Sequence, residues 1–190
     1  MTQLTVACRC GEVAGTLTGL SATFNNHLIC YCEDCQAFAR DLGAEELAMD
    51  SYGGTRIVQV TPPQLRITQG AEQLACLRLT SKGPLRWYTA CCNSPVANTV
   101  SPKLALCGIV ASFITDARME DVFGPVKYRM QRQHAIDPPP QPIITPAFPK
   151  RLIARIVLQL FYGCLRGWNS PSPFYHADGK PLQKPRRIEQ

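Results

Sequence analysis

Residues 27–40 have the sequence HLICYCEDCQAFAR, and this stretch predicts an apolar strand that turns directly into a helix. Cys30, Cys32 and Cys35 form a C-x-C-x-x-C pattern at the transition. Structural cysteines are usually buried singly, whereas thiols this close bind a metal, pair as a disulfide or act as redox partners. Free N–H groups at the start of the helix would stabilise thiolates, which favours a metal. A redox disulfide between Cys32 and Cys35 remains the alternative.

The composition predicts a soluble globular protein built around one main domain. The chain has 190 residues, of which 45% are hydrophobic, and its mean hydropathy is −0.08. No basic stretch followed by an apolar core stands at the N-terminus, so we expect the protein in the cytoplasm. Ten cysteines in a reducing compartment favour metal binding over a disulfide framework. The net charge of +6 is diffuse, and zinc-bound thiolates would lower it, so we do not expect a nucleic-acid partner.

Short runs with strand-like alternation fill the chain up to about residue 112, and glycine and proline pairs separate them. This pattern predicts a mainly-β domain. Three short helices are expected to interrupt or follow the strands, at residues 35–42, 43–50 and 114–123.

Six prolines in residues 137–149 exclude a packed helix or a central strand there and favour an extended connection. We therefore predict a β domain at residues 1–136, a proline-rich linker at 137–149 and a separate C-terminal part at 150–190. The segment KRLIARIVLQLFYGCLRGW, residues 150–168, has apolar residues at helical spacing and predicts an amphipathic helix. Its apolar run is too short to span a membrane. We expect it to pack on the β domain or across a homodimer rather than on a membrane surface, and we expect a loop-like tail after it.

Two further cysteine pairs lie far from the triplet in sequence: Cys8 with Cys10, and Cys91 with Cys92. Tetrahedral zinc takes four soft ligands in a closed structural site, or three ligands and an open position in a catalytic one. The two pairs can close one site, and the triplet can supply three ligands alone. Neighbouring side chains on a strand point to opposite faces, so only one of Cys91 and Cys92 is expected to join the site. The remaining cysteines lie in apolar runs and are expected in the core: Cys76, Cys107 and Cys164.

At this point the sequence resembles a known family. The segments CRCGEVAG (8–15) and ICYCEDCQ (29–36), then GP-x-R-x-Y (83–88) leading into a cysteine turn with Ser94-Pro95, are similar to the glutathione-dependent formaldehyde-activating enzymes, also called centromere-protein-V-like proteins. The resemblance covers about residues 5–115. It implies a β-tent fold of antiparallel sheets with a structural zinc and a catalytic zinc, so one or two Zn²⁺ per chain. It also implies that Cys30, Cys32 and Cys35 hold the catalytic zinc, and that Cys8 and Cys10 form half of the structural site.

The sequence departs from the family pattern at two places. The family's C-x-x-C-G turn, aligned on Cys92, puts Thr89 at the first cysteine and Asn93 at the glycine. Either Cys91 replaces the missing ligand, or a water or another side chain completes the site, or the structural zinc is lost; we favour Cys91. After the triplet, Gln36-Ala37-Phe38-Ala39-Arg40 replaces a basic residue and a Ser-Gly pair. The basic residues nearest in sequence that could face a tripeptide's carboxylates are Arg40, Lys82 and Arg86.

The resemblance implies a zinc-dependent carbon–sulfur lyase that adds formaldehyde or a related aldehyde to glutathione or another small thiol. Three thiolates make zinc a mild Lewis acid, which favours capture of a thiol over generation of hydroxide. A non-catalytic zinc-binding module, whose C-terminal helix recruits a partner, is the alternative. An iron–sulfur site is the third interpretation.

Overall fold

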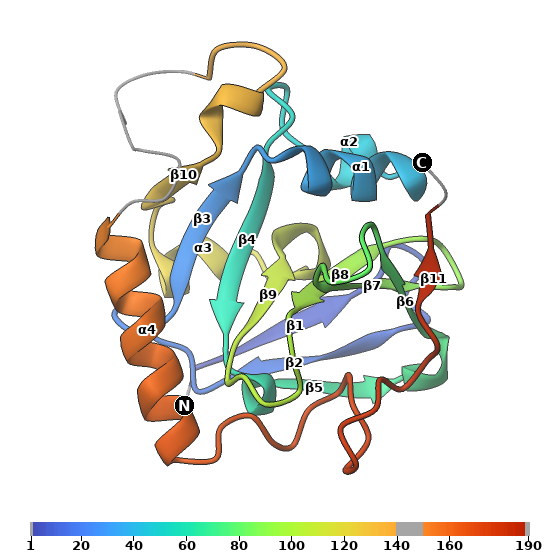
Figure 1. Cartoon of the computed structure of the whole chain (residues 1–190), viewed down its shortest axis with the longest axis vertical. Helices are drawn as coiled ribbons and strands as arrows, with labels where there is room; N and C mark the ends of the chain where they lie inside the picture. The colour runs from blue at the N-terminus through green and yellow to red at the C-terminus, as the bar shows by residue number, and fades with distance from the viewer. Residues whose placement is uncertain (1, 140–149, 189–190) are drawn as a thin grey trace.

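The chain forms two β-sheets with short helices around them over residues 2–139 and 150–188, which are the residues that this computed structural model describes (Figure 1). The smaller sheet is antiparallel and has the strand order β1-β2-β5. Its strands are β1 (Gln3–Ala7), β2 (Ala14–Thr18) and β5 (Leu65–Gln69). Leu4 and Val6 are buried and alternate with more exposed residues along β1, as a strand with one covered face requires.

Within the described residues, the larger sheet has eight strands in the order β10-β3-β4-β9-β8-β7-β6-β11. They are β3 (Asn26–Cys30), β4 (Thr55–Val60), β6 (Leu74–Arg78), β7 (Leu85–Thr89), β8 (Pro95–Thr99), β9 (Cys107–Val110), β10 (Tyr128–Met130) and β11 (Arg186–Arg187). The predicted mainly-β fold is confirmed. The sheet is mixed rather than antiparallel, because two returning segments add β10 and β11 as short parallel edge strands.

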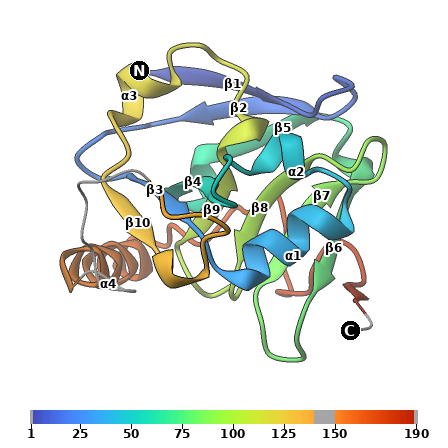
Figure 2. The same ribbon diagram turned by 90° about the horizontal axis from the view of Figure 1, so that it is seen from above.

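The main hydrophobic core lies between the two sheets. Val58, Val60 and Trp87 point into it from the larger sheet, and each is fully buried. Cys76 and Cys107 are buried in the same core, as the sequence predicted. The opposite face of the larger sheet carries the two longest helices, α1 (Glu33–Asp41) and α4 (Lys150–Leu165), as the view from above shows (Figure 2).

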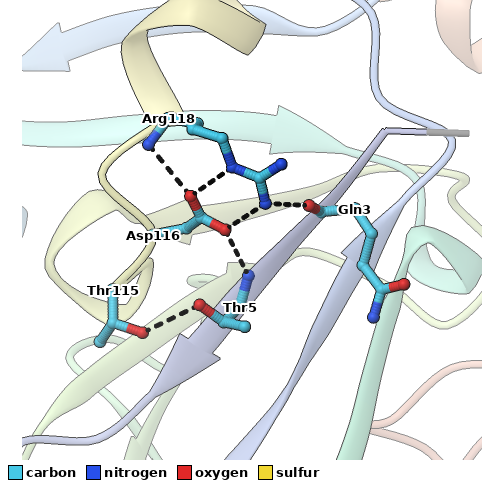
Figure 3. A network of polar contacts seen from close by, with 5 residues as sticks. All are labelled: Gln3, Thr5, Thr115, Asp116 and Arg118. Atoms are coloured by element: carbon cyan, nitrogen blue, oxygen red, sulfur yellow. Dashed lines mark hydrogen bonds and ion pairs between the residues drawn. The ribbon is translucent and has the colours of Figure 1, made fainter.

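The two other helices are short and lie where the sequence predicted them: α2 (Glu45–Ala48) and α3 (Met119–Phe123). A polar network ties the segment before α3 to the first strand (Figure 3). The Asp116 carboxylate accepts hydrogen bonds from the Arg118 guanidinium at 2.8 and 3.0 Å, and Arg118 also donates to the Gln3 carbonyl at 3.0 Å. The Arg118 hydrogen bond holds the pKa of Asp116 well below its usual value. This network fixes β1 to the chain that leaves the larger sheet.

The helix α4 packs on the larger sheet beside β3 and β10 (Figures 1 and 2). Leu152 is 1% exposed, and Arg155 donates through Nε to Asn26 Oδ1 at 2.8 Å. Gly163 permits close approach, since a Cβ at this position would lie 2.3 Å from the Ala105 Cβ. Cys164, which was expected in the core, is exposed instead. The expectation was wrong because the helix docks through a face that does not include this residue.

The segment after α4 is part of the core. Phe174 is fully buried with its ring centroid 4.9 Å from that of Trp87, and the Tyr175 hydroxyl lies 2.7 Å from Thr99 Oγ1. The tail was expected to be loop, but it ends in β11, which pairs with β6. The predicted linker falls largely on residues 140–149, which lie outside the described residues, so the predicted domain division stays a prediction. Among the described helices, none has the length and apolarity needed to cross a membrane.

Candidate metal centres

Two tight turns bring four cysteines together at one end of the sheets. Cys8 and Cys10 follow β1, and Cys91 and Cys92 follow β7. Their Sγ atoms all lie within 4.8 Å of one another. The Cys8–Cys10 and Cys10–Cys91 sulfur distances are 3.5 Å, and the Cys8–Cys91 and Cys91–Cys92 distances are 3.8 Å. Zn–S bonds of about 2.3 Å in a tetrahedron give sulfur–sulfur distances of about 3.8 Å, so this donor set fits zinc.

The turn after β7 explains why both neighbouring cysteines join this cluster. The expectation that only one could do so assumed a strand, but β7 ends at Thr89, and Asn93 takes a left-handed conformation with φ of 55°. Asparagine tolerates this conformation, which is otherwise typical of glycine. The turn therefore forms without the glycine of the C-x-x-C-G pattern, and it directs the Cys91 and Cys92 sulfurs to the same side.

Thr89, which stands where the C-x-x-C-G pattern has its first cysteine, contacts a sulfur of the cluster. Its hydroxyl lies 3.4 Å from Cys92 Sγ and accepts a hydrogen bond from the Ser94 N–H. The Ser94 hydroxyl lies 3.2 Å from the same sulfur. Burial opposes ionisation of Cys92, but the hydrogen bonds from Ser94 and Thr89 outweigh it and lower its pKa to about 5. Cys92 is thereby prepared to bind a cation as a thiolate.

The triplet Cys30, Cys32 and Cys35 forms the second cluster, at the junction of β3 and α1. Cys30 ends β3, Cys32 caps the start of α1 and Cys35 lies in its first turn. Their Sγ atoms lie within 4.8 Å of one another, and among the described residues no fourth His, Cys, Asp or Glu belongs to the group. Cys30 and Cys35 are buried, whereas Cys32 is partly exposed. Hydrogen bonds from Cys30 and Cys35 stabilise the Cys32 thiolate and strongly lower its pKa.

Arg86 lies beside the triplet and is 3% exposed. Its side chain leaves β7 on the face opposite to Trp87 and reaches α1. Nη1 lies 3.7 Å from Cys35 Sγ and 3.3 Å from Asn98 Oδ1, and Nη2 forms a 3.3 Å ion pair with Asp34. The guanidinium also lies over the Phe38 ring, 5.6 Å from its centroid. Arg86 is thus a buried cation bonded to a sulfur of the triplet.

The other two basic residues suggested by the sequence do not contact the triplet sulfurs. Arg40 is exposed and donates to Gln36 Oε1 at 2.9 Å, and Lys82 is exposed in the turn between β6 and β7. A substrate-binding role for them stays a prediction. Gln36 is buried and donates to the carbonyls of Tyr31 and His134, so it ties α1 to the segment after β10.

Several neighbours of the triplet come from parts of the chain that the sequence did not connect with it. The buried cluster around Cys30 and Cys35 includes Leu152, with Ile156 and Met130 packed against it. Thr55 lies directly opposite Cys30 on β4, and its buried hydroxyl has no hydrogen-bond partner among the residues that the structure describes. Cross-strand neighbours point to the same face. Only Arg86, the second residue of the mostly buried strand LRWYT, gave a signal in the sequence, as the one charge in that strand.

The fold and these sites define a mainly-β protein whose described residues contain two cysteine clusters, of four and three residues, each able to hold a metal such as Zn²⁺. All ten cysteines lie in the described part of the chain and are free thiols.

The chain belongs to the DUF6151 family, a family of unknown function whose pattern matches residues 1–185. A search among curated proteins finds no match. Among solved structures, the crystal structure of a Rhodobacter sphaeroides protein, determined as a structural-genomics target, is similar with 18% sequence identity and a TM-score of 0.45. The similarity covers 67% of this chain and all of the other one.

Proposed function

We propose that this protein holds a structural zinc in the four-cysteine cluster and a second zinc in the triplet, where a small thiol such as glutathione is joined to formaldehyde or a related aldehyde. The observation that carries the proposal is the contrast between the clusters. One has four sulfurs at tetrahedral spacing, while the other has three and lacks a fourth ligand among the described residues. Zinc with three protein ligands leaves a position for a substrate.

A zinc ion held by Cys30, Cys32 and Cys35 would supply a mild Lewis acid that stabilises a thiol in its thiolate form. Two groups of the chain also stabilise the negative charge of the thiolates: the Arg86 side chain and the N-terminus of α1. Arg86 places one positive charge against Cys35, which offsets part of the negative charge of three thiolates. Cys32 is the N-cap residue of helix α1, so the N–H groups of its first turn also lie next to this negative charge.

The proposed reaction needs no redox partner. The thiol sulfur forms a bond to the carbonyl carbon, the carbonyl π bond opens, and the proton of the thiol ends on the former carbonyl oxygen. Thr55 is the candidate for hydrogen bonding to a ligand here, because its buried hydroxyl is otherwise unpaired and lies opposite Cys30. The reverse reaction is a carbon–sulfur lyase step.

One observation favours a second candidate, a non-catalytic metal module. Cys30 is 8% and Cys35 5% exposed, and the apolar side chain of Leu152 belongs to the same buried cluster. Such burial is typical of structural thiolates. In that case, the triplet holds a metal but no substrate.

Metal analysis of the purified protein tests the zinc assignment. We expect two zinc ions per chain in the wild type and one after Cys30, Cys32 and Cys35 are all replaced by serine, with the fold retained by circular dichroism. Replacement of the core residue Cys76 by serine is the matched control and should leave two zinc ions. Unchanged zinc content in the triple variant would refute the assignment, and coloured protein would indicate an iron–sulfur site.

Calorimetric titration with glutathione separates the enzyme from the module. The enzyme requires saturable thiol binding that disappears in the triple-serine variant, and formation of the hydroxymethyl thioether from glutathione and formaldehyde above the uncatalysed rate. Two zinc ions per chain without thiol binding would support the structural module instead.

A further inference from the structure

The outer face of α4 exposes a continuous row of large apolar side chains. Its members are Ile153 at 45%, Val157 at 59%, Leu158 at 55%, Phe161 at 60%, Tyr162 at 49% and Leu165 at 69% exposure. The spacing of three and four residues places them along one side of the helix. The opposite side, with Leu152, Gln159 and Gly163, is buried against the rest of the chain. Figure 2 shows α4 at the outer edge of the molecule.

The size of this surface is unusual for a monomer. If a fully exposed large apolar residue has roughly 200 Å² of accessible surface, the exposed fractions of the six residues leave on the order of 700 Å². The largest apolar patch on a typical monomer measures about 300–600 Å². A standard protein–protein interface buries about 800 Å² on each partner. The outer face of α4 is therefore large enough to form most of one side of a stable interface.

The charges on α4 favour a second copy of the same helix in antiparallel orientation. The helix has no acidic residue. Lys150 and Arg151 lie at its start, Arg155 is bonded to Asn26, and Arg166 directly follows its last turn. An antiparallel pair would bring Lys150 and Arg151 of each copy beside the negative end of the other helix dipole, where Arg166 is a single cation. A parallel pair would place these four cations together. A partner with an acidic surface would bury its carboxylates against apolar side chains such as Val157 and Phe161. The apolar row itself has no positive charge to pair with them.

We propose that the outer face of α4 is the interface of a homodimer, in which two α4 helices pack antiparallel about a two-fold axis near the middle of the apolar row. Such an interface is self-complementary, so one patch serves both copies. With the axis close to residue 159, Val157 contacts Phe161 of the second copy, and Ala154 lies opposite Cys164. The small Ala154 side chain allows the helices to approach closely at that point.

Sedimentation and light scattering at several protein concentrations test the dimer directly. We expect wild-type protein to have twice the 21.0 kDa mass of one chain. Phe161→Glu places a charge at the interface centre and should weaken dimerisation by at least about 30-fold. Ile136→Glu is the matched control, because Ile136 is 59% exposed but lies outside α4, where its N–H donates to the Tyr52 carbonyl. Circular dichroism shows whether each variant folds.

Cross-linking tests the orientation independently of a charged variant. Ala154→Cys should form an intermolecular disulfide with the natural Cys164 under mild oxidation, and the product should disappear when Cys164→Ser is added. A parallel pair would instead link wild-type protein through Cys164 of both copies. That product, in place of the first, would overturn the antiparallel arrangement.

Two kinds of result would overturn the dimer. One is a wild-type chain that stays monomeric at all concentrations, or a dimer that Phe161→Glu leaves unchanged. The other is a monomer that binds vesicles made of an equal mixture of phosphatidylcholine and phosphatidylserine and loses this binding with Phe161→Glu. The second result would assign the outer face of α4 to a lipid surface.

Discussion

Replacing Arg86 by glutamine should weaken zinc binding at the triplet without affecting the four-cysteine cluster. The guanidinium is buried, and Nη1 lies 3.7 Å from Cys35 Sγ. A metal bound to three thiolates leaves a net negative charge in a region with little water, and Arg86 is the cation that contacts a triplet sulfur. Glutamine has a similar length and can still donate a hydrogen bond, so the substitution removes mainly the charge.

The expected magnitude follows from the distance and the burial. A unit charge pair at 3.7 Å contributes about 4 kcal/mol at an effective dielectric constant near 20. Desolvation of Arg86 and its 3.3 Å ion pair with Asp34 offset part of this energy. Loss of a group that supports a metal ligand usually lowers metal affinity by about 10–100-fold, and we expect Arg86→Gln to fall in this range. Arg86→Lys keeps the charge but not the planar fork and should lose less than about tenfold.

Competition with a chromophoric zinc chelator measures both sites in one titration. The four-cysteine cluster, which lies beyond the other end of β7, serves as an internal reference. Arg40→Gln is the matched control, because Arg40 is exposed and bonds to Gln36 rather than to sulfur. If Arg86→Gln leaves the triplet affinity within about twofold of wild type, or weakens both sites equally, Arg86 does not act as the counter-charge of the triplet.

Three further predictions concern other parts of the structure. Cys92→Ser should remove one zinc ion and lower the unfolding temperature, because a structural zinc contributes directly to folding stability; metal analysis and calorimetry check this. Gly163→Ala should increase hydrogen exchange in α4, since the new Cβ would lie 2.3 Å from Ala105 Cβ, and Ala105→Gly should restore protection. Burial lowers the pKa of His27, whose Nδ1–H donates to a backbone carbonyl, so the neutral form stabilises the folded state. This stabilisation is present above the ordinary histidine pKa of 6.5 and is lost as the pH falls below it. Urea unfolding at several pH values should therefore show a smaller acid-induced loss of stability in His27→Gln than in the wild type.

The spacing of apolar and polar residues was sufficient to predict most strands and the four α-helices of the described residues, α1 to α4. Alternation of apolar and polar residues follows from the geometry of a half-buried strand, so it is visible without the fold. It failed for β10 and β11, which have three and two residues and no alternation of their own. They are strands only because β3 and β6 offer free edges for pairing.

Side-chain direction in the turns also could not be predicted. Cys91 and Cys92 were expected to diverge, but the left-handed Asn93 reverses the chain and directs both sulfurs to Cys8 and Cys10. The sequence suggested Arg86, with Arg40 and Lys82, as a basic group that could face a substrate, and that role stays a prediction. The structure places it beneath the triplet, because strand alternation puts Arg86 on the face opposite Trp87 and α1 covers that face.

Three features could be predicted from the spacing of residues alone: the strand-rich character of the chain, the grouping of three cysteines at a strand-to-helix junction and the amphipathic C-terminal helix. Each of these depends on residues close together in the chain, whose spacing is fixed by backbone geometry. Three others emerged only in the folded chain: four cysteines from two distant turns form one cluster, Arg86 contacts a sulfur of the other cluster, and α4 leaves an apolar face exposed. These features depend on which faces of distant segments meet, and burial of the core between the sheets sets those contacts.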